Sequence, residues 1–312
     1  MRAVRNTENG IEVVDVPGTD AEDSDVRVHV RAAGICGSDL HLISWGPMPV
    51  TLGHEISGHL DDGTPVAIWP LIPCGRCDRC AAGEVTQCRQ AVTQSIGIGL
   101  DGGMADEMVV AESSVVPLPD GVNIADASLV EPIACSLHAL RRAGVRGDER
   151  VAVVGAGMIG LGAALVARAE GCSVDVAARH DAQRAAAERI GAGTGPDGEY
   201  DVVVDAAGTE AALRTCFDLL RPGGTLSLVA SYWEPVTFPQ FFSIKEPVIV
   251  GANMHGHGED GRDMDAAARV LAESPEVAAV MITHRFPLDR AADAFDAAGN
   301  RAAGAIKVVL EP

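Results

Sequence analysis

Residues 34–55 read GICGSDLHLISWGPMPVTLGHE and gather chemically active side chains among glycines. The stretch contains a thiol (Cys36), a hydroxyl (Ser38), two imidazoles (His41 and His54) and two carboxyl groups (Asp39 and Glu55). Thiolate, imidazole and carboxylate are zinc ligands, and a catalytic zinc takes three protein ligands while one position stays open. Each residue alone is explained by ordinary packing or surface exposure. Their combination, with glycine on both sides of Cys36 and before His54, indicates a metal site.

A second cluster of metal-binding side chains follows in residues 70–90. Its cysteines have the pattern C-x2-C-x2-C-x7-C and are Cys74, Cys77, Cys80 and Cys88. Four thiolates at loop spacings are typical of a closed, tetrahedral structural zinc site. An iron–sulfur cluster also uses four cysteines, but its last spacing differs and a proline usually follows. A disulfide framework is typical of small secreted chains, so the sequence favours structural zinc.

Length and composition bound the class of protein. The chain has 312 residues, enough for two domains, and is 47% hydrophobic and 22% charged, as in soluble globular proteins. Its net charge of −20 argues against nucleic acid or an anionic membrane as a partner. No apolar run approaches the roughly 20 residues of a membrane span, and the N-terminal residues lack a signal-peptide core. We therefore expect a cytoplasmic protein.

The second half of the chain contains a dinucleotide-binding motif. Gly155, Gly157 and Gly160 form G-x-G-x-x-G in VAVVGAGMIG (151–160), after an apolar strand and at the start of a helix. In this context glycines let the backbone approach a pyrophosphate, which the free N–H groups of the helix N-terminus attract. Strands and helices then alternate, which is typical of a doubly wound parallel sheet. The segment 205–208 ends one strand and is expected near the cofactor.

The residue type at the end of the second strand indicates the cofactor. Sites for NAD place an acidic residue there for the ribose 2′-hydroxyl, whereas this chain has Arg179, 19 positions after Gly160. A guanidinium suits a 2′-phosphate, and a charge-assisted bond contributes about 1.5–3 kcal/mol. Asp175 is the rival candidate, but it falls inside the strand. The sequence thus favours NADP over NAD.

Other segments complete the predicted architecture. Residues 1–33 alternate short β-patterned runs with acidic turns, and the last strand is expected to return to the first domain. A helix is expected from Asn123 as N-cap, and it carries Glu131, a carboxylate among apolar residues that requires a partner. His255 and His257 suggest a further metal site or a flexible polar loop, and the sequence favours the loop.

These motifs, in this order and over essentially the whole chain, resemble the zinc-dependent medium-chain alcohol dehydrogenases. The segments GICGSDLH, GHE, the four-cysteine lobe, VEPIACSLHALRRAGV, VAVVGAGMIG and GAIKVVL are most similar to those of the polyol (sorbitol-type) and threonine dehydrogenases. The resemblance implies an α/β protein with a GroES-like β-rich catalytic domain, residues 1–119 and 285–312. A Rossmann domain, residues 120–284, completes the chain.

The resemblance also implies the site residues. The catalytic zinc ligands would be Cys36, His54, and Glu55 or Glu131, with Ser38 and His41 as a proton relay. We expect the dinucleotide to contact the glycine loop and its neighbours, namely Gly155, Gly157, Met158, Ile159, Gly160, Arg179, His180, Arg184, Ala206 and Gly208. Three anionic groups (Cys36, Glu55 and Glu131) would weaken the Lewis acidity of zinc if all bound together. We therefore expect one glutamate to exchange with water or substrate.

The implied reaction is hydride transfer between NADP(H) and an alcohol or polyol, or the corresponding ketone or aldehyde. The alternatives are a non-catalytic zinc- and nucleotide-binding protein, or a zinc-independent relative that reduces activated double bonds. The latter class usually lacks the set Cys36, His54 and Glu131. The apolar run PVIVGANM (247–254) is expected to pair at a sheet edge and form a homodimer or homotetramer.

Overall fold

The computed structural model describes residues 1–22, 24–258 and 261–312, and its contacts divide them into two compact units. The first unit comprises Met1–Glu131 and Glu259–Pro312, and the second comprises Pro132–Gly258. Residues 120–131 and 259–284, expected in the Rossmann domain, therefore belong to the first unit. The reason is packing, because the turn η4 (Ala127–Leu129) contacts β3, β4 and β5, and helix α7 (Asp263–Glu273) contacts β7 and η4.

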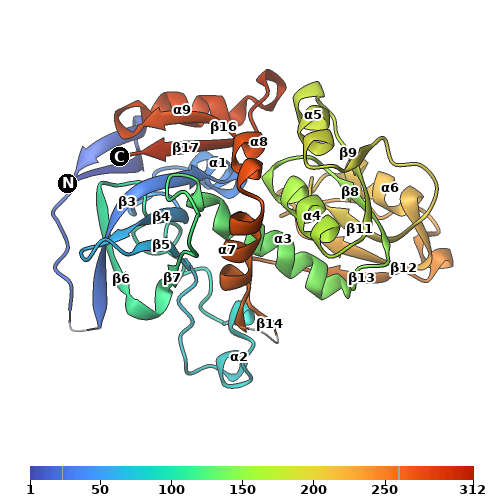
Figure 1. Ribbon diagram of the computed structural model, residues 1–312, viewed down its shortest axis with the longest axis horizontal. Helices are drawn as coiled ribbons and strands as arrows, with labels where there is room; N and C mark the ends of the chain where they lie inside the picture. The colour runs from blue at the N-terminus through green and yellow to red at the C-terminus, as the bar shows by residue number, and fades with distance from the viewer. Residues whose placement is uncertain (23, 259–260) are drawn as a thin grey trace. The chain divides into compact units, whose positions relative to one another are not determined.

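The first unit is built on a mostly antiparallel sheet. Its strand order is β16-β17-β3-β4-β5-β7, β6 pairs with β3, and β1 and β2 form a separate hairpin (Figure 1). The strands are β1 (Arg2–Thr7), β2 (Gly10–Asp15), β3 (Asp25–Ile35), β4 (Glu55–Leu60), β5 (Pro65–Ile68), β6 (Glu107–Ala111), β7 (Val115–Pro117), β15 (Gly261–Arg262), β16 (Ile282–Pro287) and β17 (Lys307–Glu311). The C-terminal strand β17 lies between β16 and β3, which confirms the predicted return of the chain.

Alternating residues of these strands form the core of the first unit. Val28, Ile56, Val66 and Val308 are fully or almost fully buried in one apolar cluster, in line with the period of two in the sequence. The helices of this unit are α1 (Gly37–Leu42), α2 (Asp78–Ala81), α7, α8 (Ala278–Met281) and α9 (Ala291–Gly299). None of the helices in the described part of the chain has both the length and the apolar character needed to span a bilayer.

The second unit contains a six-stranded parallel sheet with the order β10-β9-β8-β11-β12-β13 (Figure 1). Its strands are β8 (Arg150–Val154), β9 (Ser173–Ala177), β10 (Gly193–Thr194), β11 (Tyr200–Asp205), β12 (Leu220–Leu228) and β13 (Val248–Gly251), and β14 (His257–Gly258) ends the unit. Its helices are α3 (Val130–Ala143), whose first two residues belong to the first unit, α4 (Met158–Ala169), α5 (Asp181–Arg189) and α6 (Glu210–Leu219).

The order of these strands creates a topological switch point. From β8 the chain adds β9 and β10 on one side, then returns to add β11, β12 and β13 on the other. Parallel sheets bind ligands beyond the carboxyl ends of the strands at such a point. The glycine loop after β8 and the loop after β11 both lie there. The doubly wound arrangement that the sequence predicts therefore brings the two loops together.

Two local predictions require correction. The helix expected from Asn123 begins later, at Val130, because the Asn123 side chain accepts a bond from the N–H of Ala125 (3.1 Å) and holds a turn instead. The interpretation of His255 as part of a flexible polar loop is wrong. Its side chain is fully buried, and one of its ring nitrogens lies within 4.8 Å of the Cys135 sulfur in the same unit. His257 is exposed, as expected.

Candidate functional site

Three metal-binding side chains from residues 34–55 meet in the first unit. Cys36 follows the last residue of β3 and caps the short helix α1, while His54 and Glu55 stand at the start of the neighbouring strand β4. One ligand atom from each of Cys36, His54 and Glu55 lies within 4.8 Å of the others. Thiolate, imidazole and carboxylate at this separation form a donor set that suits zinc.

The close approach of the strands depends on Gly34. Gly34 of β3 lies directly opposite Glu55 of β4, and a Cβ on Gly34 would overlap the Glu55 carboxylate. A larger residue at this position would push that carboxylate away. Gly34 therefore allows the charged side chain to lie inside the sheet.

A lysine from the opposite end of the chain binds this carboxylate. Lys307, the first residue of β17, is 3% exposed and donates to Oε1 of Glu55 (2.6 Å), to Oε2, and to the carbonyl oxygen of Ile35 (2.9 Å). Burial disfavours the ammonium ion, but the Glu55 carboxylate outweighs this effect and the pKa of Lys307 is raised. All three donors of the ammonium group are thus used, as a buried charge requires.

Lys307 changes the charge balance of the metal site. A Cys36 thiolate, Glu55 and Glu131 carry three negative charges. With the positive charge of Lys307 the net charge is −2, which one Zn²⁺ ion would neutralise. The role of Lys307 at this site was not predicted, although it is one of only two lysines in the chain and lies in the apolar run GAIKVVL. Lys307, like Glu131, is a charged residue among apolar ones and requires a partner.

Glu131 lies in the first turn of α3 and is 6% exposed. It is outside the set of three ligand atoms formed by Cys36, His54 and Glu55. Burial raises the pKa of Glu55, Lys307 opposes this, and the negative charge of Glu131 raises it further. The negative charge of Glu131 therefore acts on Glu55 within the first unit.

Asp39 supports the imidazole of His54. Its Oδ1 lies 3.4 Å from Nδ1 of His54, and its Oδ2 accepts from the N–H of Cys36 (2.8 Å). Burial alone would lower the pKa of His54, but Asp39 and the Cys36 sulfur raise it well above its ordinary value. A carboxylate behind a histidine ligand orients its ring, a role that the sequence analysis did not assign to Asp39.

The two residues predicted as a proton relay occupy different surroundings on α1. The Oγ of Ser38 lies 3.4 Å from Nε2 of His54, next to the donor set. His41 is exposed one turn further along, and partial burial together with the charge of Arg301 lowers its pKa. A neutral imidazole can accept a proton near neutral pH. Arg301, which was not predicted, adds to the effect of burial in favouring that form.

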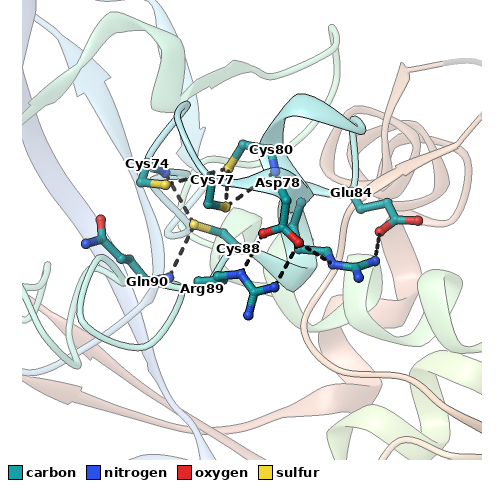
Figure 2. A network of polar contacts seen from close by, with 9 residues as sticks. Cys74, Cys77, Asp78, Cys80, Glu84, Cys88, Arg89 and Gln90 are labelled. Atoms are coloured by element: carbon teal, nitrogen blue, oxygen red, sulfur yellow. Dashed lines mark hydrogen bonds and ion pairs between the residues drawn. The ribbon is translucent and has the colours of Figure 1, made fainter.

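The four cysteines form a second donor set. One ligand atom from each lies within 4.8 Å of the others, and the sulfur atoms turn toward one another (Figure 2). The Cys77–Cys80 and Cys74–Cys80 sulfur distances are 3.5 and 3.9 Å. Zn–S bonds of about 2.3 Å in a tetrahedron require sulfur separations of about 3.8 Å. The residues of this lobe therefore fit one zinc ion with no open position.

Backbone N–H groups also point at these sulfur atoms. Cys74 and Gln90 donate to Cys88 (both 3.4 Å), and Cys80 donates to Cys77 (3.5 Å). The N–H groups of Arg89 and Cys80 lower the pKa of Cys77 to about 6. Hydrogen bonds of this kind favour the thiolate form that a metal requires.

The glycine loop of the second unit has the geometry expected for a pyrophosphate site. Gly155 has φ +104°, a conformation that favours glycine, and a Cβ on Gly160 would collide with the Gly155 carbonyl oxygen. Gly157 caps α4, and the space where its Cβ would lie is open. Met158 and Ile159 form the first turn of α4, whose N–H groups attract anions.

The end of β9 carries cationic rather than acidic side chains. Arg179 is exposed two residues beyond β9, and His180 caps α5. Arg184 donates to the carbonyl oxygen of Ala178 (3.0 Å) and binds Asp181. These contacts anchor the turn from which Arg179 projects.

The rival candidate Asp175 is engaged elsewhere. Its Oδ2 accepts from the hydroxyl of the buried Tyr200 (2.8 Å), and Asp175 pairs with Gly193 of β10 in the sheet. It therefore belongs to the interior of the strand and supports the sheet.

A buried carboxylate organises the loops at the switch point. Oδ1 of Asp205 accepts from the N–H groups of Ala207 (2.9 Å) and Gly208 (3.0 Å), and Oδ2 accepts from the Tyr232 hydroxyl (2.6 Å). A Cβ on Gly155 would meet Ala206 at 3.0 Å, so the two loops touch. Asp205 thus ties the loop after β11 to the loop after β12, and Tyr232 is a contributor that the sequence analysis missed.

Two family models match the chain. Residues 22–120 match the alcohol dehydrogenase GroES-like domain, and residues 159–273 match the zinc-binding dehydrogenase domain. These matches confirm the predicted fold class.

Related proteins cover nearly the whole chain. L-galactonate-5-dehydrogenase of Escherichia coli is 32% identical over 91% of this chain and 89% of its own length. The crystal structure of galactitol-1-phosphate dehydrogenase from Escherichia coli has a TM-score of 0.88 at 28% identity and covers 100% of both chains. A zinc-binding dehydrogenase from Sinorhizobium meliloti, bound to NADP, has a TM-score of 0.88 at 29% identity and covers 100% of this chain and 99% of its own.

The residues matched by the first family model contain both the donor set beside β4 and the four-cysteine lobe. The chain therefore belongs to the zinc-dependent medium-chain alcohol dehydrogenase family, in its polyol dehydrogenase-like subgroup, and is an enzyme of the alcohol dehydrogenase type.

Proposed function

We propose that this enzyme transfers hydride between NADP(H) and a polyol or other secondary alcohol, or the corresponding ketone. The observation that carries the proposal is the donor set of Cys36, His54 and Glu55, whose ligand atoms lie within 4.8 Å of one another. The names of its relatives, which act on galactonate and galactitol 1-phosphate, support a polyhydroxylated substrate.

Zinc bound at this site would supply Lewis acidity at the substrate oxygen. Cys36 and His54 would hold the metal permanently, with Asp39 fixing the His54 ring. Lys307 already binds both carboxylate oxygens of Glu55. We therefore assign Glu131 as the persistent third ligand and Glu55 as the group that exchanges.

The proton of the alcohol leaves through the chain's own side chains. Oγ of Ser38 lies beside the donor set and accepts this proton, and a ring nitrogen of His41 carries it to solvent. Partial burial and the charge of Arg301 lower the pKa of His41, so the ring is neutral and ready to accept. In the reduction direction the same groups deliver a proton to the carbonyl oxygen.

The dinucleotide binds at the switch point of the second unit. Its pyrophosphate lies at the N-terminus of α4 above Gly157, and Ala206 and Gly208 border the same site. Arg179 binds the 2′-phosphate, with His180 and Arg184 holding the turn. Asp175 is unavailable for the ribose because it binds Tyr200.

The cofactor assignment is tested by comparing kcat/KM with NADP and NAD. A charge-assisted contact of about 1.5–3 kcal/mol predicts a preference for NADP of about 10- to 150-fold. Arg179→Asp should remove or reverse this preference, whereas Arg189→Asp on the exposed end of α5 makes the same charge change and should not. An Arg179→Asp variant that keeps the NADP preference would contradict the assignment.

The substrate class is tested with a panel of polyols, sugar alcohols, simple secondary alcohols and their ketones, by following absorbance of the reduced nicotinamide. Turnover should disappear in Cys36→Ser and in zinc-depleted protein. A zinc-depleted enzyme that reduces activated double bonds at an undiminished rate would refute the proposed chemistry.

The second unit also offers a surface for a further copy of the chain. The edge strand β13 exposes Val248 (53%) and Ile249 (36%), and edge strands pair readily. We propose that β13 of two copies pair in a homodimer, or within a homotetramer. Light scattering after size-exclusion chromatography should show dissociation for Val248→Lys and none for Val92→Lys, at a still more exposed position of the first unit (70%). An unchanged mass for Val248→Lys would rule out this interface.

A further inference from the structure

The four-cysteine lobe contains an ion pair that touches no sulfur atom but joins two ligand segments. Asp78 follows Cys77, and Arg89 follows Cys88. The Arg89 guanidinium binds the Asp78 carboxylate through two parallel bonds, Nε to Oδ1 (2.5 Å) and Nη2 to Oδ2 (2.8 Å) (Figure 2). Paired bonds of this kind fix both distance and orientation.

Arg89 contacts the Cys77 segment a second time through its backbone. Its N–H group bonds to the Cys77 sulfur, while its side chain binds the next residue, Asp78. The N–H of the following residue, Gln90, bonds to Cys88 (3.4 Å). A shift of residues 88–90 along residues 77–78 would break the ion pair and the bond from the Arg89 N–H to the Cys77 sulfur together.

The electrostatic balance supports the same role. Four thiolates around one Zn²⁺ ion leave two net negative charges, which a nearby guanidinium stabilises. The carboxylate of Asp78 would repel this centre, and Arg89 compensates for it. The pair therefore places a cation beside the cluster and keeps it there.

We propose that the Asp78–Arg89 pair is a clasp that holds Cys77 and Cys88 in ligand geometry and sets how slowly the lobe releases its zinc ion. Asp78 and Arg89 are positioning residues in this role, because neither contacts the metal. Cys77 and Cys88 lie 11 positions apart in sequence. The Asp78–Arg89 pair joins the two ends of the loop between them. The inference is independent of the substrate and of the cofactor.

The experiment measures zinc release from the full-length, zinc-loaded protein into excess 4-(2-pyridylazo)resorcinol, whose absorbance reports free zinc. The phase that belongs to the lobe is the one lost in Cys77→Ser. Both partners of the pair are about half exposed or more, and exposed ion pairs contribute little energy. Arg89→Gln should therefore increase the rate of this phase by only about two- to five-fold. Asp78→Asn should act in the same direction, and the double variant should release zinc no faster than Arg89→Gln.

Matched controls separate geometry from charge. Arg76→Gln removes the same charge from an exposed residue next to Cys77, and Glu84→Gln breaks another ion pair of the lobe, Arg79–Glu84 (2.7 Å). Both should release zinc at the wild-type rate. Arg89→Lys, which keeps the charge without the paired bonds, should fall between wild type and Arg89→Gln.

Three results would overturn the proposal. These are a wild-type release rate in Arg89→Gln, an equal acceleration in Arg76→Gln, or purified wild-type protein without zinc in the lobe. The last result would also contradict the prediction of a structural zinc site in the lobe. The proposed reaction is tested separately, by turnover.

Discussion

Lys307→Met should destabilise the enzyme strongly, because it leaves the Glu55 carboxylate buried without its cation. The pair is almost inaccessible to solvent, with side-chain exposures of 3% and 1%. Removing one partner of a buried ion pair costs about 3–5 kcal/mol. Protonation of Glu55 limits this cost, because burial raises the pKa of its carboxyl group. An unfolded glutamate has a pKa of about 4.3, so holding the proton at pH 7 costs about 3.7 kcal/mol at about 1.36 kcal/mol per pKa unit.

The pH dependence identifies the cause. In Lys307→Met the folded pKa of Glu55 is raised above its unfolded value, so the folded state holds the extra proton. Stability relative to wild type should therefore fall as pH rises from about 5 to 9, by up to about 1.4 kcal/mol per unit. The assay is urea unfolding followed by circular dichroism at several pH values, with zinc content matched between proteins.

Two further variants sharpen the test. Lys307→Arg keeps the charge and should lose less stability than Lys307→Met. The double variant Lys307→Met/Glu55→Gln removes both charges and should recover stability at pH 9. A Lys307→Met protein that unfolds like wild type at every pH would refute the reasoning, as would a loss of stability that does not change with pH.

Three other perturbations test the remaining contacts. Gly34→Ala places a methyl group on the Glu55 carboxylate and should cost about 1–3 kcal/mol, measured by thermal unfolding. Tyr232→Phe leaves Asp205 without its hydroxyl partner and should weaken dinucleotide binding by up to about 10- to 150-fold, from a lost bond to a charged group of about 1.5–3 kcal/mol, measured by nicotinamide fluorescence. Asp39 and the Cys36 sulfur outweigh the effect of burial and raise the pKa of His54, so zinc must displace a proton from its ring. The affinity of the metal-free protein for zinc should therefore rise with pH above about 6.5, measured by chelator competition.

Each of these perturbations has a control. Gly299→Ala adds a methyl group in open space and should leave stability within about 0.5 kcal/mol of wild type. Thr215→Val removes a hydroxyl from α6 in the same unit and should leave dinucleotide binding unchanged. Affinity for zinc that is the same at pH 6 and pH 8 would contradict a protonated His54. Equal dinucleotide affinities of Tyr232→Phe and wild type would show that Asp205 orders its loops without Tyr232.

Much of the architecture was predictable because its signals are local. Strands of period two, the glycine loop and the spacing of the four cysteines each depend on residues within about 15 positions of one another. The helix beginning at Val130 was placed too early because Asn123 is typical of both an N-cap and a turn, and only its actual bond to Ala125 separates the two. His255 was misinterpreted because polar neighbours in sequence do not reveal burial.

The sequence by itself determined which chemical groups are present: a thiol, an imidazole and carboxylates near Cys36, four further thiols, and a glycine loop beside Arg179. Only the tertiary structure decided how their charges are balanced. Lys307 and Glu55 are 252 positions apart and meet because β17 pairs with β3 and Gly34 leaves room between the strands. Contacts across a sheet depend on strand order and register, which single residues do not encode, so the cation at the metal site became visible only in the folded chain.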